Sequence, residues 1–189
     1  AAQAEQAGRP DVNSREGLLG VLVFADSHTC STPVTLAQCP AIRLAQTPAA
    51  YMPIFVTPFA QLDLIRQPDQ LHEPLQAFDA ADEYLLNHVH AQGLPDNAQV
   101  LVLNDSFGAL AASLAGRADV TSSGDSHLGY LGLQVNLQRN QLSPQAVRFV
   151  PSSATAQGPF DWVLVRVPKT LALLEEQLIR LHGQLAPGA

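Results

Sequence analysis

Few residues of this 189-residue sequence belong to the types that build metal sites, disulfide frameworks or nucleic-acid-binding surfaces. The two cysteines, Cys30 and Cys39, fit no CxxC or other metal-site spacing, and a single pair does not make a disulfide scaffold. Lysine and arginine together number only 10, and the formal net charge is −7. A free-standing nucleic-acid-binding protein is disfavoured, because affinity for phosphates comes from clustered cations. We expect a protein of a reducing compartment, the cytoplasm, with no bound metal.

Long hydrophobic runs are also missing. The only strong apolar run of the first 51 residues, Leu18–Ala25, is about eight residues long and too short to span a bilayer, so no membrane partner is expected. Arg9 and Arg15 ahead of it give a weak similarity to a signal peptide, but the chain does not begin with Met and no small-x-small cleavage site follows. Because the single methionine is Met52, we interpret residues 1–51 as a leader, disordered or not native.

The sequence does contain 47% apolar and only 14% charged residues, which is typical of a folded globular domain. Its most informative stretch begins at Val100–Leu103, four large apolar residues in a row, as in a parallel strand buried on both faces. Ser106 can cap a helix that continues through Leu114 and ends at Gly116. This order predicts the first strand, loop and helix of a Rossmann-like unit, whose loop would hold a nucleotide cofactor.

The rest of the chain alternates between strand and helix patterns. Upstream, one or two short strands broken by Pro58 precede a helix that starts at Pro74 and stops at Gly93. Downstream, the apolar spacing predicts strand 119–124, helix 125–140, strand 146–150, strand 162–167 and helix 171–185. Helices between strands imply right-handed crossovers and a parallel sheet. The predicted fold class is therefore α/β, a partial Rossmann-like parallel sheet with flanking helices and a degenerate cofactor loop.

The predicted cofactor loop lacks the residues that a cofactor needs. A dinucleotide or S-adenosylmethionine loop has glycines where the backbone approaches the ligand, whereas residues 104–108 contain one glycine, Gly108, beside the bulky Phe107. Asp125 lies where such folds place an acid for the ribose hydroxyls, but it is also a candidate helix N-cap. Asp105 is either a loop acid or a turn former. We interpret Asp105, Gly108 and Asp125 as vestigial positions and assign no cofactor-binding residue.

No catalytic residue is assigned either. An enzyme that methylates an amino group needs hydrogen-bond acceptors and a flat side chain after the fourth strand, commonly Asn-Pro-Pro followed by Phe or Tyr. Val167–Thr170 keeps only one proline, and Lys169 is a donor without acceptor capacity. The six histidines have no ligand-like partners by spacing, and no GxSxG elbow accompanies Ser126-His127. The patterns indicate neither a methyltransferase active site nor a hydrolase triad.

Four segments together resemble the ribosomal RNA large-subunit methyltransferase G family: Pro74–Leu86, Leu103–Leu110, Gly124–Ser126 and Val167–Glu175. The resemblance runs from about Met52 to the end and covers the amino-terminal half of that family; the small-subunit methyltransferase C group is similar at a greater distance. It implies two Rossmann-like methyltransferase domains in tandem. The second binds S-adenosylmethionine and methylates the exocyclic N2 of a guanine in large-subunit ribosomal RNA, using Asn-Pro-Pro-Phe. The first is a degenerate, non-catalytic copy that helps to hold the RNA.

The resemblance divides the chain into a leader at 1–51, N-terminal strands and a helix at 52–96, and the first four strand–helix units of a Rossmann-like domain at 97–189. The sequence stops where a fifth strand should begin. We therefore expect the fourth strand to be an unpaired edge. The expected partners are protein-free large-subunit ribosomal RNA and a C-terminal catalytic domain outside this chain, which carries the S-adenosylmethionine.

Positive charges after Asn136 are the candidates for RNA contact, because only three acidic residues oppose them there. The candidates are Arg139, Arg148, Arg166, Lys169 and Arg180. Arg166 and Lys169, at the edge of the predicted crevice, are the preferred pair for positioning phosphates. Alternatively, Arg180 pairs with Glu176, Arg148 is a solvated strand residue, and the chain is an inactive fragment or a plain interaction module that binds neither RNA nor S-adenosylmethionine.

Overall fold

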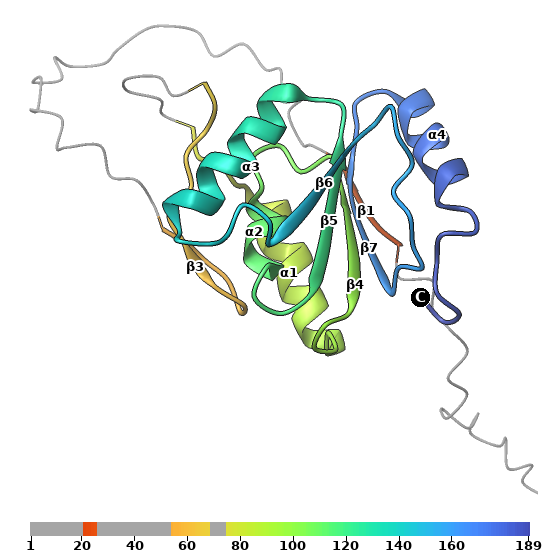
Figure 1. The fold of residues 1–189 in the computed structure, drawn as a ribbon, viewed down its shortest axis with the longest axis horizontal. Helices are drawn as coiled ribbons and strands as arrows, with labels where there is room; N and C mark the ends of the chain where they lie inside the picture. The colour runs from red at the N-terminus through yellow and green to blue at the C-terminus, as the bar shows by residue number, and fades with distance from the viewer. Residues whose placement is uncertain (1–20, 26–53, 69–74) are drawn as a thin grey trace, which may run out of the picture.

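A computed structural model of the chain describes residues 21–25, 54–68 and 75–189. Its centre is a five-stranded parallel sheet in the order β1-β7-β4-β5-β6, beside a small antiparallel hairpin, β2-β3 (Figure 1). The elements are β1 Val21–Ala25, β2 Phe55–Val56, β3 Gln61–Leu62, α1 Ala80–Gln92, β4 Gln99–Leu103, α2 Ala109–Leu114, β5 Asp119–Gly124, α3 His127–Arg139, β6 Val147–Pro151, β7 Trp162–Val167 and α4 Leu171–Leu181. Apart from β1, the leader 1–51 lies outside the described residues.

The order in which the chain adds strands to the sheet changes direction between β4 and β7. From β4 it proceeds outward to β5 and β6, and then returns to β7 on the other side of β4. Leu101 is accordingly in register with Thr121 on one side and with Val163 on the other. Open parallel sheets bind ligands at the carboxyl ends of the strands on either side of such a point. The four strands predicted after residue 97, and their parallel arrangement, are confirmed.

The prediction that the fourth strand of this series, β7, is an unpaired edge is wrong. β1 lies parallel to β7, with a backbone register that runs from Val21 opposite Val163 to Ala25 opposite Val167. The apolar run of the leader therefore supplies a strand, because its extended backbone pairs the peptide groups that β7 would otherwise leave open. At the other side of the sheet, β6 pairs only with β5 within the described part of the chain.

One face of the sheet is covered by α4 and by the loop between β6 and β7. The buried apolar residues of this face are Leu101, Leu103, Ala156, Phe160, Val163, Val165 and Leu181. α4 ends at Leu181 rather than at the predicted residue 185, and Leu185 instead bridges to Phe160. α4 thus packs one apolar stripe on this face of the sheet, and the chain after α4 covers the part of the layer near Phe160.

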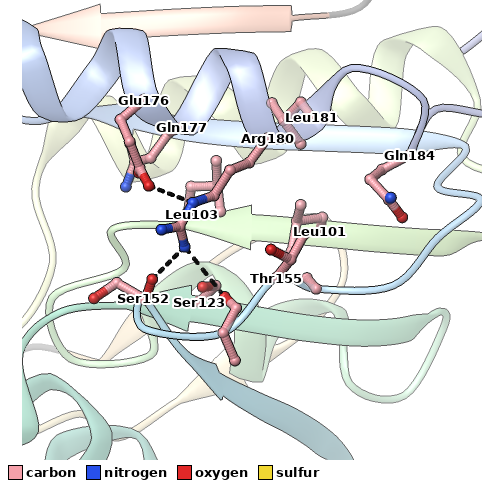
Figure 2. A pocket seen from close by; sticks show the side chains of 12 residues that line it. Leu101, Leu103, Ser123, Ser152, Thr155, Glu176, Gln177, Arg180, Leu181 and Gln184 are labelled. Atoms are coloured by element: carbon pink, nitrogen blue, oxygen red, sulfur yellow. Dashed lines mark hydrogen bonds and ion pairs between the residues drawn. The ribbon is translucent and has the colours of Figure 1, made fainter.

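Arg180 of α4 joins the helix to that loop. Figure 2 shows its guanidinium between the carboxylate of Glu176 and the backbone carbonyl oxygen of Ser152, with which it forms an ion pair and a hydrogen bond. A cavity of about 40 Å³ remains beneath it, next to Leu101 and Leu103. This space has room for little more than water, so we interpret this face of the sheet as a packing surface rather than a ligand site.

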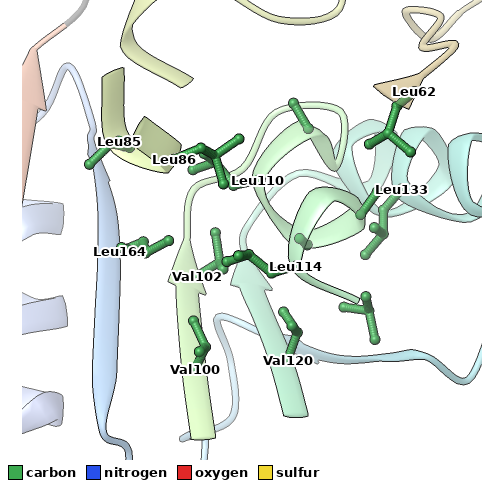
Figure 3. Close-up of a cluster of buried hydrophobic side chains, with 14 of the residues drawn as sticks. Leu62, Leu85, Leu86, Val100, Val102, Leu110, Leu114, Val120, Leu133 and Leu164 are labelled. Atoms are coloured by element: carbon green, nitrogen blue, oxygen red, sulfur yellow. The ribbon is translucent and has the colours of Figure 1, made fainter. Parts of the chain in front are cut away.

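The main hydrophobic core lies on the opposite face, between the sheet and α1, α2 and α3 (Figure 3). Val100 and Val102 of β4 face Leu86, Leu110 and Leu133 from the three helices, and none of these side chains is more than 1% exposed. All six residues of α2 are buried. Burial of such side chains stabilises the fold by about 1.5–3 kcal/mol each, relative to exposure. This layer holds the loop after β4 in a fixed place.

The start of α1 differs from the sequence-based expectation. The helix begins at Ala80 and not at Pro74, because Asp79 caps it: the Asp79 carboxylate accepts hydrogen bonds from helical amides, and the Asp82 carboxylate accepts one from the Asp79 amide at 3.0 Å. This is a capping box, which satisfies donors at both ends of the first turn. None of the helices in the described residues is both long and apolar enough to cross a membrane.

Asn136 of α3 and Asn140, the C-cap residue of this helix, anchor the chain after β3. Asn136 is fully buried; it accepts a hydrogen bond from the Ile65 amide at 2.9 Å and donates to the carbonyl oxygens of Ile65 and Phe107 at 3.0 and 2.8 Å. Asn140, one turn later, bonds both backbone groups of Asp63 at 2.8 and 2.9 Å. The two side chains therefore replace a neighbouring strand for this segment, whose backbone groups would otherwise lack partners.

We expect Asn136→Ala to lower the free energy of unfolding by about 2 kcal/mol or more, because it leaves buried backbone groups of Ile65 and Phe107 without partners. Urea unfolding followed by circular dichroism measures the change. Gln138→Ala, on the exposed side of the same helix, is the matched control and should change stability by less than about 0.5 kcal/mol. Equal effects of the two substitutions would contradict the assignment of Asn136 as an anchor.

Candidate functional site

A polar crevice lies where the fold rule places a ligand, at the carboxyl ends of β4, β5 and β7. It encloses about 560 Å³ and is lined by three loops, which comprise residues 104–107, 123–126 and 166–170, and by the aromatic side chains of Tyr130 and Phe149. Two of these loops carry the predicted vestigial positions Asp105 and Asp125, and the third carries Lys169, a predicted RNA-contact residue. The structure thus brings Asp105, Asp125 and Lys169 to one crevice.

The amino end of α2 in this crevice is capped by the protein's own carboxylate. Asp105 accepts hydrogen bonds from the amides of Gly108 and Ala109, both at 3.1 Å, and of Ala111 at 2.9 Å. The predicted cap, Ser106, makes no such bond, and Gly108 is the N-cap residue. Helix amino ends attract anions because their amides lack partners. Here Asp105 provides the anion, so those amides are not offered to a ligand.

Gly108 serves helix packing. Its φ is +82°, a region that favours glycine, and a Cβ built on it would lie 2.7 Å from Leu133 Cδ1 and 2.9 Å from Leu133 Cα. Phe107, the residue before Gly108, packs against Gly132 of α3, the helix that also carries Leu133. The guanidinium carbon of Arg66 lies 4.8 Å from the centre of the Phe107 ring. The single glycine of the loop therefore lets α2 approach α3, and does not open the backbone to a ligand.

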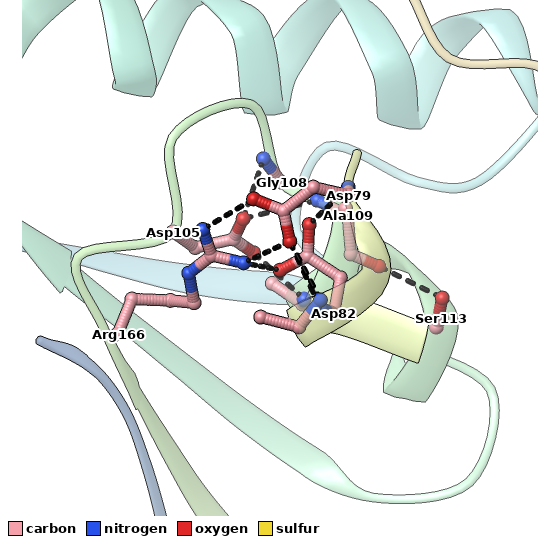
Figure 4. Close-up of polar contacts among 9 residues, drawn as sticks. Asp79, Asp82, Asp105, Gly108, Ala109, Ser113 and Arg166 are labelled. Atoms are coloured by element: carbon pink, nitrogen blue, oxygen red, sulfur yellow. Dashed lines mark hydrogen bonds and ion pairs between the residues drawn. The ribbon is translucent and has the colours of Figure 1, made fainter. Parts of the chain in front are cut away.

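Arg166, at the end of β7, lies among three carboxylates (Figure 4). Its Nη1 donates to Asp82 at 2.6 Å and to Asp79 at 2.8 Å, and its Nη2 donates to the second oxygen of Asp79 at 2.7 Å. The Arg166 side chain is only 11% exposed. Its backbone carbonyl oxygen accepts a further hydrogen bond from Asn104 at 2.8 Å. Arg166 therefore ties the ends of β4 and β7 to the first turn of α1.

The three carboxylates share this one guanidinium, and their pKa values shift accordingly. The hydrogen bond from Arg166 lowers the pKa of Asp79. Burial raises the pKa of Asp82 to about 7; the charge of Asp105 adds to the rise, and Arg166 opposes it. Burial also raises the pKa of Asp105, against the hydrogen bonds from the amides it caps. The cluster consequently retains a proton on Asp82 up to near-neutral pH.

The predicted RNA-contact residues fall into two groups. Arg139 forms an ion pair with Asp63 at 2.6 Å, and Arg180 and Arg166 are bonded to carboxylates as described. Arg148 and Lys169 are exposed and form no ion pair within the described residues. A guanidinium already held by carboxylates is a poor contact for phosphate, because the ion pair must first break. This placement disfavours direct contact by Arg166, and leaves Lys169 as the one predicted RNA-contact residue that is exposed at the crevice.

Asp125 is not a helix cap. The cap of α3 is Ser126, whose Oγ accepts a hydrogen bond from the Gly129 amide at 3.1 Å. Asp125 is exposed at the mouth of the crevice. Of the histidines, His90 packs edge-on against Phe59, and no group of three or more metal-ligating side chains occurs in the described ranges.

Two aromatic residues that no sequence pattern singled out, Tyr130 of α3 and Phe149 of β6, line the far end of the crevice. Their ring centres lie 4.8 Å apart at an interplanar angle of 44°. One signal in the sequence could have drawn attention to this region: no acidic residue occurs between Asp125 and Asp161, in a chain whose net charge is −7.

Comparison with known proteins adds the following findings. A family model described as the RLMG N-terminal domain matches residues 52–189. "Ribosomal RNA large subunit methyltransferase G" of Ectopseudomonas mendocina is 75% identical over 138 residues, and that of Pseudomonas aeruginosa PAO1 is 74% identical over the same length. Each match covers 73% of this chain and 37% of the relative, so the chain spans just over a third of these proteins. Precorrin 8w decarboxylase of Methanobacterium thermoautotrophicum is similar in structure, with a TM-score of 0.49 and 20% identity over 67% of this chain and 66% of that one.

Gly108→Ala should lower the free energy of unfolding by about 2 kcal/mol, since the new Cβ would collide with the backbone of Leu133 and strain a positive φ. Thermal or urea unfolding measures the loss. Gly116→Ala is the matched control, because nothing lies within 4 Å of a Cβ at that position. A neutral effect of Gly108→Ala would show that α2 and α3 do not need this close approach.

The stability of the chain should decrease as the pH rises from about 4 to about 7. The pKa of Asp82 is about 7 in the folded chain and 3.8 in the reference state, so between these values the folded state holds a proton that the unfolded state has lost. The pKa of Asp79 is lowered, so protonation of Asp79 changes the free energy of unfolding only at pH values below this range. Urea midpoints at about pH 5 and about pH 8 measure the trend.

Asp82→Asn should reduce this dependence but not abolish it, because burial raises the pKa of Asp105 as well. Glu83→Gln, an exposed neighbour in α1, should leave it unchanged. The same slope in both variants would show that a group other than Asp82 causes it.

Proposed function

Because this chain belongs to the RLMG N-terminal domain family, we propose that it is a non-catalytic domain that positions large-subunit ribosomal RNA for a guanine-N2 methyltransferase. The methyl donor, S-adenosylmethionine, is bound in this proposal by a catalytic domain outside this chain. The protein acts in the cytoplasm, without a membrane partner. The names of the relatives support the RNA and the reaction class.

The observation that carries the non-catalytic part of the proposal is the cap on α2. The Asp105 carboxylate is bonded to three amides at the helix end that faces the crevice. A methyl donor with a carboxylate of its own would meet a like charge there, and would find no open glycine backbone because Gly108 packs on α3. After β7, Lys169 occupies the place where acceptors for a target amine would be needed.

Two cations of the crevice lining, beside the exposed carboxylate of Asp125, are candidates for contact with a polyanion. Lys169 is exposed on its rim, and Arg66 lines the same space. Arg148 adds a second exposed cation on β6. We assign Lys169 and Arg148 as phosphate contacts, and Arg166 as a positioning residue that fixes the loop carrying Lys169. Phosphate contacts of this kind set the register of an RNA without reading its sequence.

A plain interaction module is the second candidate, and the net charge of −7 favours it. The two functions differ in their response to salt. RNA binding through phosphates weakens steeply as salt increases, because bound counterions are released on association. A protein partner recognised through apolar contacts would not show this dependence.

The 189-residue chain should bind protein-free large-subunit ribosomal RNA, and Lys169→Gln should reduce the slope of log affinity against log salt by about one. Fluorescence anisotropy over a salt series measures both. Arg117→Gln is the matched control, since Arg117 is paired with Asp96 at 3.1 Å at the amino ends of the strands.

Calorimetry of the same chain with S-adenosylmethionine should show no binding. Heat of binding from the methyl donor would contradict the non-catalytic assignment. The absence of any salt-sensitive RNA affinity would favour the interaction module.

A further inference from the structure

A second groove adjoins the crevice, between α3 and the edge strand β6. It encloses about 560 Å³, and its lining includes Tyr130 and Gln134 of α3, Gln145 of the connecting loop, and Arg148 and Phe149 of β6. We call it the α3–β6 groove. Tyr130 and Phe149 also line the crevice, so the two spaces meet at this aromatic pair. The path from Lys169 through the pair to Arg148 is therefore continuous along the surface.

The aromatic pair presents ring surface at this junction. Tyr130 and Phe149 are both half-buried, and their rings are tilted by 44° with centres 4.8 Å apart. Phe149 packs against the main core on its inner side. The core thus supports the Phe149 ring on one side, and both half-buried rings line the two spaces. Rings held in this way are suitable for stacking with a planar ligand.

The polar groups of the α3–β6 groove suit a nucleotide. Gln134 lies one helical turn after Tyr130, is half-buried, and its amide makes no hydrogen bond within the described residues. An amide offers both a donor and an acceptor, as the edges of the bases require. Arg148 is exposed, and no acidic residue occurs in the sequence between Asp125 and Asp161. The sequence on either side of Arg148 therefore adds no acidic side chain that would repel a phosphate.

We propose that the α3–β6 groove binds an unpaired RNA nucleotide, with its base stacked on Tyr130 and Phe149 and its flanking phosphates near Arg148 and Lys169. The inference rests on the proposed function and specifies the form of RNA that the domain recognises. A base inside a duplex is already stacked on its neighbours, and so only a splayed or single-stranded base can use these rings.

The test uses the 189-residue chain and a single-stranded RNA of about ten nucleotides that contains 5-iodouridine. Ultraviolet crosslinking and mass spectrometry should locate the crosslink on Tyr130 or Phe149. In anisotropy titrations Tyr130→Leu should weaken binding of this RNA about tenfold, and should leave binding of the same sequence as a duplex unchanged. Tyr84→Leu is the matched control, because Tyr84 is 55% exposed on α1. Arg148→Gln should lower the salt slope by about one, and Arg117→Gln should not.

The outcomes separate the two proposals. Equal affinity for single strand and duplex, crosslinks at other residues, or undiminished binding by a folded Tyr130→Leu variant would overturn the groove while the proposed function stands. If the chain binds neither this RNA nor large-subunit ribosomal RNA at any salt concentration, both are overturned. If Tyr130→Leu does not fold, the crosslink in the unmodified chain and the Arg148→Gln titration decide the matter.

Discussion

The guanidinium of Arg166 is the link on which the crevice depends. It carries one positive charge among Asp79, Asp82 and Asp105, and it joins the end of β7 to the first turn of α1. Asp105 in turn fixes α2 through three backbone amides. The loop after β4 and the loop after β7 are thus set by charges and caps that belong to the protein. Breaking this link would leave carboxylates buried without a counter-charge, which is strongly destabilising.

If the domain is non-catalytic, as we propose, this arrangement explains how a Rossmann-like sheet persists without the chemistry that such sheets often support. The sheet, the crossovers and the crevice at the switch point depend on buried apolar strands and helices, and these are intact. Ligand binding depends instead on a few loop positions. Asp105 and Phe107 fill those positions, and Gly108 serves contact with α3. The fold and its function are therefore separable here, in agreement with the general independence of function from fold.

The sequence was sufficient for much of the fold, but for less of the site. Strands such as β4 and β7 were predictable because continuous apolar runs are typical of strands buried on both faces. The starts of helices were less predictable. For α1, Pro74 was preferred over Asp79 as the first residue, although Asp79 and Asp82 have the spacing of a capping box. Asp79 and Asp82, the carboxylates bonded to Arg166, lie more than 80 residues before it in the chain, and no local pattern indicates such a pair. The position of Arg166 at the edge of the crevice was predictable from the strand pattern, but its ion pairs with Asp79 and Asp82 depend on the tertiary fold.

The complete burial of α2 has a consequence for how the domain opens. This short helix contacts α1, α3 and β5. The amides of Ala109 and Ala111 donate to Asp105, and the amide of Ala112 donates to the Gly108 carbonyl oxygen. Water reaches those amides only when one of the surrounding layers separates from the sheet. Partial fraying is therefore not available to α2. Deuterium uptake along this helix follows the loss of the whole core, so a single six-residue segment reports the global stability of the domain.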